Sequence, residues 1–246
     1  MKSLKNNIFR VLLVSLAALL FLGGSVGNLF LSGNFLWGEL EARLHVTRTG
    51  SGSLRMECPL MIAPWETAAI KTSVTNTLVD KNTKPQVNAI FSTEKGQRVE
   101  SQTLALAPLE RQPLQWTTDK NDLIYDRLIL VNVLQRPYSK LPSHQGACSI
   151  LVYSLFDMSG MNTLVFLAVV SIFCGLAGIV LLSRLLRPLN HLTEQLLKIN
   201  TVFLCLAVAG FLSALPRLWG ITIIFDSAAL LTLTTALTEV FLFPKK

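Results

Sequence analysis

Two long apolar stretches enclose a polar segment, and this alternation limits the possible folds more than any other feature of the chain. The first stretch runs from residue 8 to about residue 31, and the second runs from about 163 to 182. About 20 apolar residues form a helix that crosses the roughly 30 Å hydrocarbon core of a bilayer. The chain is 51% hydrophobic with a mean hydropathy of +0.49, above the balance of a soluble protein. We therefore expect a membrane protein with the lipid bilayer among its partners.

Two further apolar stretches, residues 200–215 and 221–243, predict a helical hairpin near the end of the chain. The turn between them contains Trp219, a residue type that favours the membrane interface. Four transmembrane helices are thus expected.

The basic residues lie mostly beside the apolar stretches. The net charge is +7, but residues 39–160 carry 13 Lys/Arg and 12 Asp/Glu, whereas the rest of the chain carries 9 and 3. Because basic residues favour the cytoplasmic side, we expect a multi-pass protein of the cell membrane with both termini cytoplasmic and residues about 32–160 extracytoplasmic. The polar segment has no basic stripe, which argues against a nucleic-acid partner.

The first apolar stretch has two interpretations. A retained membrane anchor is favoured because the apolar character continues to Leu36. The alternative is a cleavable signal peptide, with Ser25-Val26-Gly27 as its small-residue site. Both interpretations place the following segment outside the cytoplasm.

Glycines recur at helical spacing in the first two apolar stretches. Gly23 and Gly27 form one small-xxx-small pair, and Gly175 and Gly178 lie in the second stretch. Small residues let helix backbones approach closely, so these four are predicted to be helix-packing positions. The alternative for the first pair is that it eases a frayed helix end.

The polar segment alternates apolar and polar residues with a period of about two, as strands with one buried face do. Turn residues (Pro, Gly, Asn or Asp) bound each alternating run. The expected strands include residues 69–75, 86–91, 99–106, 114–117, 128–134 and 148–153. Such a series predicts an all-β antiparallel sandwich.

Four short motifs in this segment resemble the bacterial immunoglobulin-like adhesion modules of the CARDB type. Pro64-Trp65-Glu66-Thr67 precedes a strand that ends Val74-Thr75-Asn76-Thr77, and Leu106-Ala107-Pro108-Leu109-Glu110 precedes Trp116-Thr117-Thr118. Trp65 stands where that family usually has glycine. The resemblance covers roughly residues 58–118 and implies an immunoglobulin-like fold for a module that binds, spaces or braces, with no reaction.

Two of the four cysteines, Cys58 and Cys148, lie near the first and last strands of the polar segment. An exported compartment permits disulfides, so we predict a bridge between them. The alternatives are a reactive thiol or a metal site. His45 and His144 are the nearby candidate ligands, and the chain has no CxxC or HxxxH spacing, so no metal is expected.

Residues 181–199 repeat leucine or isoleucine at four-three spacing, which predicts an amphipathic helix with Glu194 and Lys198 one turn apart. Arg187-Pro188-Leu189, Leu192-Thr193 and Ile199 resemble the first helix of a HAMP signalling linker. Instead of the second helix of a HAMP linker, another apolar stretch follows. We therefore expect a cytoplasmic elbow helix lying on the inner leaflet over residues 184–199.

Two acidic residues fall within predicted transmembrane helices and are functional candidates for that reason. Asp226 lies near the outer interface, where Arg217 is expected to neutralise it, and Glu239 lies near the inner boundary. About 140° separates the two acids around a helix of 100° per residue, so interfacial pairing is favoured over a shared proton or ion path.

The sequence contains no recognised catalytic constellation: GxSxG, HExxH, phosphate-loop and dinucleotide motifs are absent. We therefore expect a non-catalytic protein without a cofactor, serving as an interaction or assembly subunit of an envelope complex. The alternatives are an accessory subunit of a transporter and a sensor that signals through the HAMP-like elbow. The candidate partner-surface residues are Trp65, Tyr125, Arg136 and Tyr138.

The chain is expected to divide into five parts. They are residues 1–38 (anchor and connector), 39–158 (exported β-sandwich), 159–183 (second transmembrane helix), 184–199 (elbow) and 200–246 (transmembrane hairpin).

Overall fold

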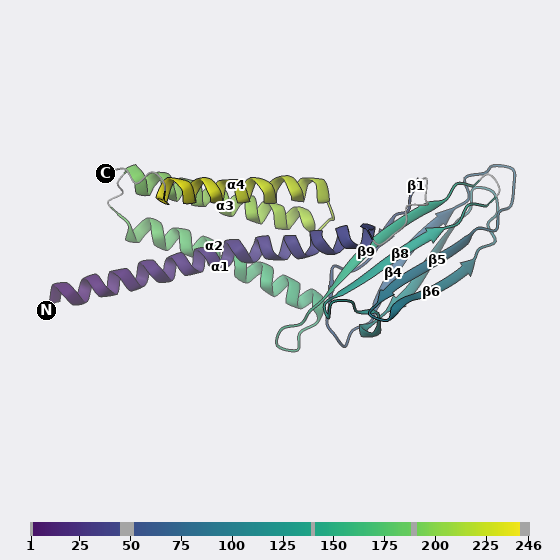
Figure 1. Cartoon of the computed structure of the whole chain (residues 1–246), viewed down its shortest axis with the longest axis horizontal. Coiled ribbons are helices and arrows are strands. Elements are labelled where there is room, and N and C mark those ends of the chain that lie inside the picture. The colour runs from purple at the N-terminus through teal and green to yellow at the C-terminus, as the bar shows by residue number, and fades with distance from the viewer. Residues whose placement is uncertain (1, 45–51, 139–140, 188–190, 242–246) are drawn as a thin grey trace. The chain divides into compact units, whose positions relative to one another are not determined.

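A computed structural model gives the fold of the chain and describes residues 2–44, 52–138, 141–187 and 191–241 (Figure 1). It divides the chain into two compact units. The helical unit comprises Met1–Leu36 and Val165–Lys246, and the β unit comprises Trp37–Leu164.

Four helices are present in the described part of the chain: α1 (Lys2–Leu44), α2 (Gly160–Leu185), α3 (His191–Ala214) and α4 (Trp219–Phe241). Three of them, α1 to α3, contain stretches long and apolar enough to cross a membrane. The apolar part of α4 is shorter, Trp219–Thr235. Helices α3 and α4 run side by side as the expected hairpin (Figure 1).

Glycines let α1 and α2 approach closely. A Cβ atom added to Gly24 would collide with the backbone of α2 at Ser171 and Gly175, and one added to Gly178 would lie 2.5 Å from the Phe21 amide nitrogen. A Cβ on Gly23 would meet nothing within 4 Å. Within this chain Gly24, rather than Gly23, makes the close contact with α2, because each residue turns a helix by 100° and the two glycines face different directions.

The other two predicted glycines do contact neighbouring helices. A Cβ on Gly27 would lie 3.4 Å from the Ser171 side chain, and one on Gly175 would lie 2.6 Å from the Leu204 side chain of α3. The ring of Phe203 on α3 packs edge-on against Phe21 of α1 at a centroid distance of 6.2 Å. Glycines and one pair of aromatic rings thus form contacts between α1, α2 and α3.

The amphipathic helix expected over residues 184–199 is not a single helix. Helix α2 ends at Leu185, and α3 begins at His191 and continues to Ala214 without a break. Pro188 explains the division, because a proline disfavours helical geometry at the residue before it. The expected Glu194–Lys198 ion pair is present, with a distance of 2.8 Å between Oε1 and Nζ.

The connector expected within residues 1–38 is also helical, because α1 continues to Leu44. Residues 37–44 lie on one face of the β unit. A Cβ on Gly38 would approach the Ser149 hydroxyl oxygen to 2.7 Å, and Ala42 is buried with Leu128 and Leu130.

Two sheets form the β unit. The larger has the strand order β1-β9-β8-β5-β6, with β3 also paired to β9, and the smaller has the order β2-β4-β7. The strands of the larger sheet are β1 (Gly52–Ser53), β3 (Met61–Ile62), β5 (Gln86–Thr93), β6 (Gly96–Thr103), β8 (Leu128–Gln135) and β9 (His144–Val152). Those of the smaller sheet are β2 (Met56–Glu57), β4 (Ala68–Thr75) and β7 (Arg111–Thr118), and a short 3-10 helix, η1 (Lys120–Asp122), follows β7. Strands β1 and β3 pair parallel to β9, and the other pairings are antiparallel.

One hydrophobic cluster joins the two sheets. In β4, alternate residues are buried, so that Ile70 and Val74 point into this cluster while Lys71 and Thr75 are exposed. Strand β8 is buried on both faces, because its other side packs against residues 37–44. The core side chains from the two sheets include Ile70, Trp116, Phe91, Val131 and Ile150.

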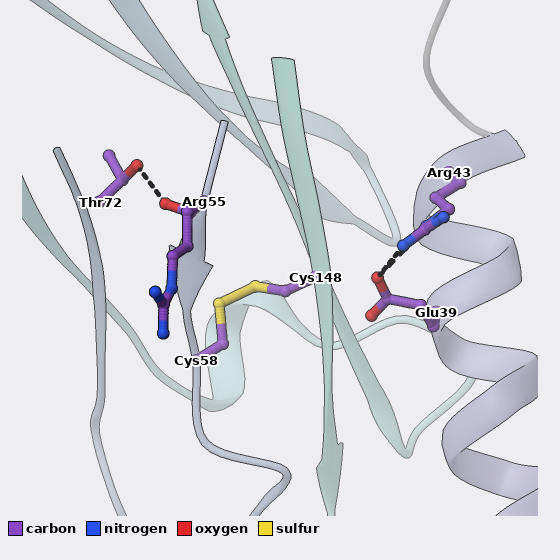
Figure 2. Close-up of a disulfide and its surroundings, with 6 residues drawn as sticks. All are labelled: Glu39, Arg43, Arg55, Cys58, Thr72 and Cys148. Carbon is purple, nitrogen blue, oxygen red and sulfur yellow. Dashed lines mark hydrogen bonds and ion pairs between the residues drawn. A yellow bond between two sulfur atoms is a disulfide. The ribbon is translucent and has the colours of Figure 1, made fainter. Parts of the chain in front are cut away.

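The predicted bridge between Cys58 and Cys148 is confirmed (Figure 2). Cys148 lies in the centre of β9 and is fully buried, whereas Cys58 follows β2. The bridge ties the segment between the two sheets to β9 and closes a sequence separation of 90 residues. The other two cysteines, Cys174 and Cys205, are free.

Candidate functional site

The turns before β4 and β7 share the sequence Ala-Pro-x-Glu and the same hydrogen bonds. Glu66 donates its N–H to the Ala63 carbonyl at 3.0 Å and accepts the Ala63 N–H on Oε2 at 2.7 Å. Glu110 makes the matching pair of bonds to Ala107 at 3.1 and 2.7 Å. In each turn the carboxylate closes the loop on a backbone amide. The repeat was visible in the sequence, but the function of its glutamates was not.

The residue before each glutamate differs in backbone conformation. Leu109 has a φ of 58°, in the left-handed region that favours glycine, whereas Trp65 is not among the residues with positive φ. The structure therefore accommodates Trp65 at the position where the CARDB family usually has glycine.

Glu66 makes one contact that Glu110 does not. Its Oε2 also accepts the N–H of Gly160, the first residue of α2, at 3.0 Å. The first N–H groups of a helix lack partners within the helix and carry a partial positive charge, so a carboxylate there is stabilising. Gly160 itself lies so close to the backbone of Ile62 that a Cβ would collide with it. The start of α2 is thus fixed to the turn before β4.

A charged cluster joins β6 to the end of β7. Arg98 donates from Nε to Asp122 Oδ1 at 2.8 Å and from Nη2 to Asp122 Oδ2 at 2.6 Å, and it also pairs with Glu100. Its guanidinium lies 3.9 Å from the centre of the Phe91 ring. The hydrogen bonds that Arg98 donates to Asp122 raise the pKa of Arg98 above its ordinary value. Asp122 is buried and also accepts the Thr118 hydroxyl, so this cluster holds the two sheets together.

A surface hollow of about 710 Å³ lies between the β5–β6 hairpin and the loop before β8. Its described lining residues are Ser92, Thr93, Glu94, Gly96, Gln97, Ile124 and Tyr125. Tyr125 is exposed, and it and Asp126 both have positive φ, of 53° and 55°. Non-glycine residues in this conformation are uncommon and cluster at functional sites.

The hydroxyl of Tyr125 donates to Oε1 of Glu41, near the end of α1, at 3.2 Å. The negative charge of Glu41, and then this hydrogen bond, raise the pKa of Tyr125 above its ordinary value. The bond holds the aromatic ring in place beside the hollow.

The other three candidate partner-surface residues are exposed but lie outside the hollow. Trp65 is in the turn before β4, and Arg136 and Tyr138 follow β8. Of the candidate metal ligands, His45 lies outside the described residues, and a ring nitrogen of His144 lies 3.2 Å from the Pro142 carbonyl oxygen. Within the described ranges, no three His, Cys, Asp or Glu side chains gather as metal ligands would.

Asp226 points into the helical unit. A Cβ on Gly210 of α3 would collide with Asp226 Oδ1, and Ser32 of α1 lies beside the carboxyl group. Oδ1 is buried and has no hydrogen-bond partner. The expected pairing of Asp226 with Arg217 stays a prediction. Arg217 lies in the turn before α4, whereas Asp226 lies seven residues into that helix, about 10 Å further along the axis.

Glu239 belongs to α4, but its side chain lies outside the described residues. The threonines Thr232, Thr234, Thr235 and Thr238 donate to carbonyl groups of their own helix. A hydroxyl contact between α3 and α4 joins Ser213 and Thr222 at 2.9 Å.

The polar contact between α1 and α2 also went unrecognised in the sequence. The Ser171 hydroxyl donates to the buried Asn28 side chain at 3.2 Å, and Asn28 donates to the Gly24 carbonyl at 2.9 Å. A buried asparagine within an apolar stretch is a signal that would have identified it.

No protein-family model matches the chain, and no curated protein matches it. Solved structures resemble 44% of the chain. They include a cycloisomaltooligosaccharide glucanotransferase from Paenibacillus sp. (20% identity, TM-score 0.34), a superoxide reductase (neelaredoxin) from Ignicoccus hospitalis (9%, 0.32) and a CARDB domain from Pyrococcus furiosus solved with di-metal ions (10%, 0.32). The match covers 15%, 86% and 99% of these chains, respectively. No functional residue is transferred from any of them.

Proposed function

We propose that the chain is a multi-pass membrane protein that presents an immunoglobulin-like β module outside the cytoplasm and serves as a non-catalytic subunit of an envelope complex. Helices α1 and α2 flank the β unit in the sequence, and both are long and apolar enough to cross a membrane. Four crossings, with α4 as the last, would bring both termini to the cytoplasmic side, where the basic excess belongs. The Cys58–Cys148 bridge agrees with an oxidising exterior.

The observation that carries the docking function is the hollow beside Tyr125. Glu94 is the one carboxylate among its described lining residues, and that lining contains no histidine, lysine or cysteine. The hydroxyl groups of Ser92, Thr93 and Tyr125 lie in the same lining as the Glu94 carboxylate and make the hollow a polar surface. An exposed tyrosine beside polar side chains is typical of the centre of a protein interface.

Extraction in mild detergent, followed by mass measurement of the intact particle, tests this proposal. We expect a companion protein in fixed stoichiometry, which is lost in a Tyr125→Ala variant. Tyr138→Ala is the matched control, because Tyr138 is also exposed but lies outside the hollow. A monomer or homo-oligomer recovered repeatedly without a companion would refute the proposal, as would equal loss in both variants.

Asp226 favours a second candidate function, an accessory subunit of a transporter. An acidic oxygen without a hydrogen-bond partner, buried between helices, is expensive to keep and usually serves ion or substrate passage. Asp226→Asn would then abolish transport by the complex while leaving its assembly intact. Unchanged transport in this variant would remove the candidate.

A further inference from the structure

Exposed aromatic residues gather at the end of the β unit where α2 begins. Trp65 is 56% exposed, Tyr153 44% and Phe156 80%. We call these three side chains the aromatic rim. Large exposed aromatic groups at one end of a unit indicate contact with another surface.

The first member, Trp65, is held at the level of the first turn of α2. The next residue, Glu66, accepts the N–H of Gly160, and the residue before Pro64, Ala63, is buried. Because Gly160 also lies against the backbone of Ile62, the turn that carries Trp65 cannot move along α2 independently. Trp65 therefore lies at about the level of Gly160 along the axis of α2.

The other two members are tied to the same place. Tyr153 follows β9 and donates its N–H to the Ile62 carbonyl at 2.9 Å. The loop that carries Phe156 folds back along α2, where the Leu155 N–H reaches the Thr163 hydroxyl at 3.4 Å. Phe156 has a φ of 51°, so the fold maintains an unfavourable backbone conformation at this exposed residue.

The length of α2 places this level in the headgroup region. Helix Gly160–Leu185 has 26 residues, which is about 39 Å at 1.5 Å per residue. The hydrocarbon core is about 30 Å thick, so roughly 9 Å of α2 extends beyond it. If the excess is shared between the two ends, Gly160 lies about 4–5 Å outside the hydrocarbon. Aromatic side chains concentrate at this depth because an apolar ring and a polar edge are both accommodated there.

We infer that the aromatic rim inserts into the headgroup region of the extracytoplasmic leaflet and seats the β unit on the lipid surface. The occupant is lipid because α2 continues from the rim directly into a stretch suited to hydrocarbon. The inference rests on the proposed crossing of the membrane by α2.

The accessibility of nitroxide labels in proteoliposomes tests the inference on the full chain. With Cys174 and Cys205 changed to serine, single labels are placed by Trp65→Cys and Phe156→Cys. Oxygen, which partitions into lipid, and a water-soluble nickel chelate are the two paramagnetic probes. The matched water control is Leu109→Cys. This residue is 62% exposed and occupies the equivalent turn at the other end of β4 and β7, where Thr75 pairs with Arg111.

We expect the nickel chelate to collide with the labels at positions 65 and 156 several-fold less often than with the label at position 109. Oxygen should collide with the labels at positions 65 and 156 at least as often as with the label at position 109. Labels that behave like position 109 would overturn the inference. So would labels that neither probe reaches, because the rim would then contact protein. A label at Phe173, 70% exposed in α2, reports separately on the crossing. If nickel reaches it as freely as position 109, the proposed topology fails and the inference with it.

Discussion

The variant Glu66→Gln is expected to lower the free energy of unfolding of the β unit by about 2–3 kcal/mol, and Glu110→Gln by about 1 kcal/mol or less. Glutamine keeps an acceptor oxygen but loses the charge. A hydrogen bond to a charged group contributes about 1.5–3 kcal/mol and a neutral one about 1, so each bond loses roughly 1 kcal/mol. Glu66 accepts from Ala63 and Gly160, whereas Glu110 accepts from Ala107 alone.

The start of α2 adds a further loss specific to Glu66. A negative charge at a helix N-terminus contributes about 0.3–1 kcal/mol. Glu110 is exposed and lies at no helix end, so water replaces much of what its variant loses. The difference between the two variants therefore measures the contact between the turn and α2.

Urea unfolding of the full-length protein in detergent measures both values, with the fluorescence of the buried Trp116 as the signal. With a denaturant dependence of about 1–3 kcal/mol per molar urea, a loss of 2–3 kcal/mol moves the midpoint by roughly 1 M. Equal shifts in the two variants would refute the reasoning, because the α2 contact would then contribute nothing.

Three other changes test separate parts of the β unit. Replacing Cys58 and Cys148 with serine should lower the free energy of unfolding by about 4–5 kcal/mol, since the bridge closes a loop of 90 residues; identical urea curves with and without reductant would contradict this. Leu109→Gly should raise it by about 0.5–1 kcal/mol, because glycine relieves the cost of a side chain at φ 58°; a lower urea midpoint would contradict this. The pKa of Tyr125 is raised, so the contact between its neutral phenol and Glu41 stabilises the fold below about pH 10, the pKa of a free tyrosine, and this stabilisation is lost as the pH rises through the folded pKa. An absorbance titration should show one tyrosine that ionises at a higher pH than a free tyrosine in the wild type and at the ordinary pH in Glu41→Gln. An unchanged titration curve in this variant would show that Glu41 does not raise the pKa of Tyr125.

Patterns with a fixed period could be read from the sequence. The alternation at residues 69–75 corresponds to β4, and that at 128–134 corresponds to β8. The pairing of Cys58 with Cys148 followed from their places beside the first and last strands. By contrast, β1, β2 and β3 have two residues each, and two residues show no period. The β5–β6 hairpin is tighter than expected, because Gly96 has a φ of 137° and pairs directly with Thr93.

Features that depend on direction around a helix, or on contacts between distant segments, could not be read in this way. A small-xxx-small pattern identified α1 as a packing helix but chose Gly23 over Gly24, since spacing alone does not show which face meets a neighbour. The contact of Asp226 with Gly210 depends on how α3 and α4 pack. The cap of Gly160 by Glu66 joins residues 94 positions apart, and no local pattern encodes that contact.

The buried position of Cys148 sets the order of events when the protein matures. Its sulfur lies inside the closed core, where a disulfide-forming catalyst cannot reach it. Direct attack of a catalyst on Cys148 must therefore precede closure of the two sheets. The yield of bridged protein thus depends on the rate of thiol oxidation relative to the rate of core closure. Conditions that slow only the oxidant should trap molecules with near-native sheets and a reduced cysteine sealed inside.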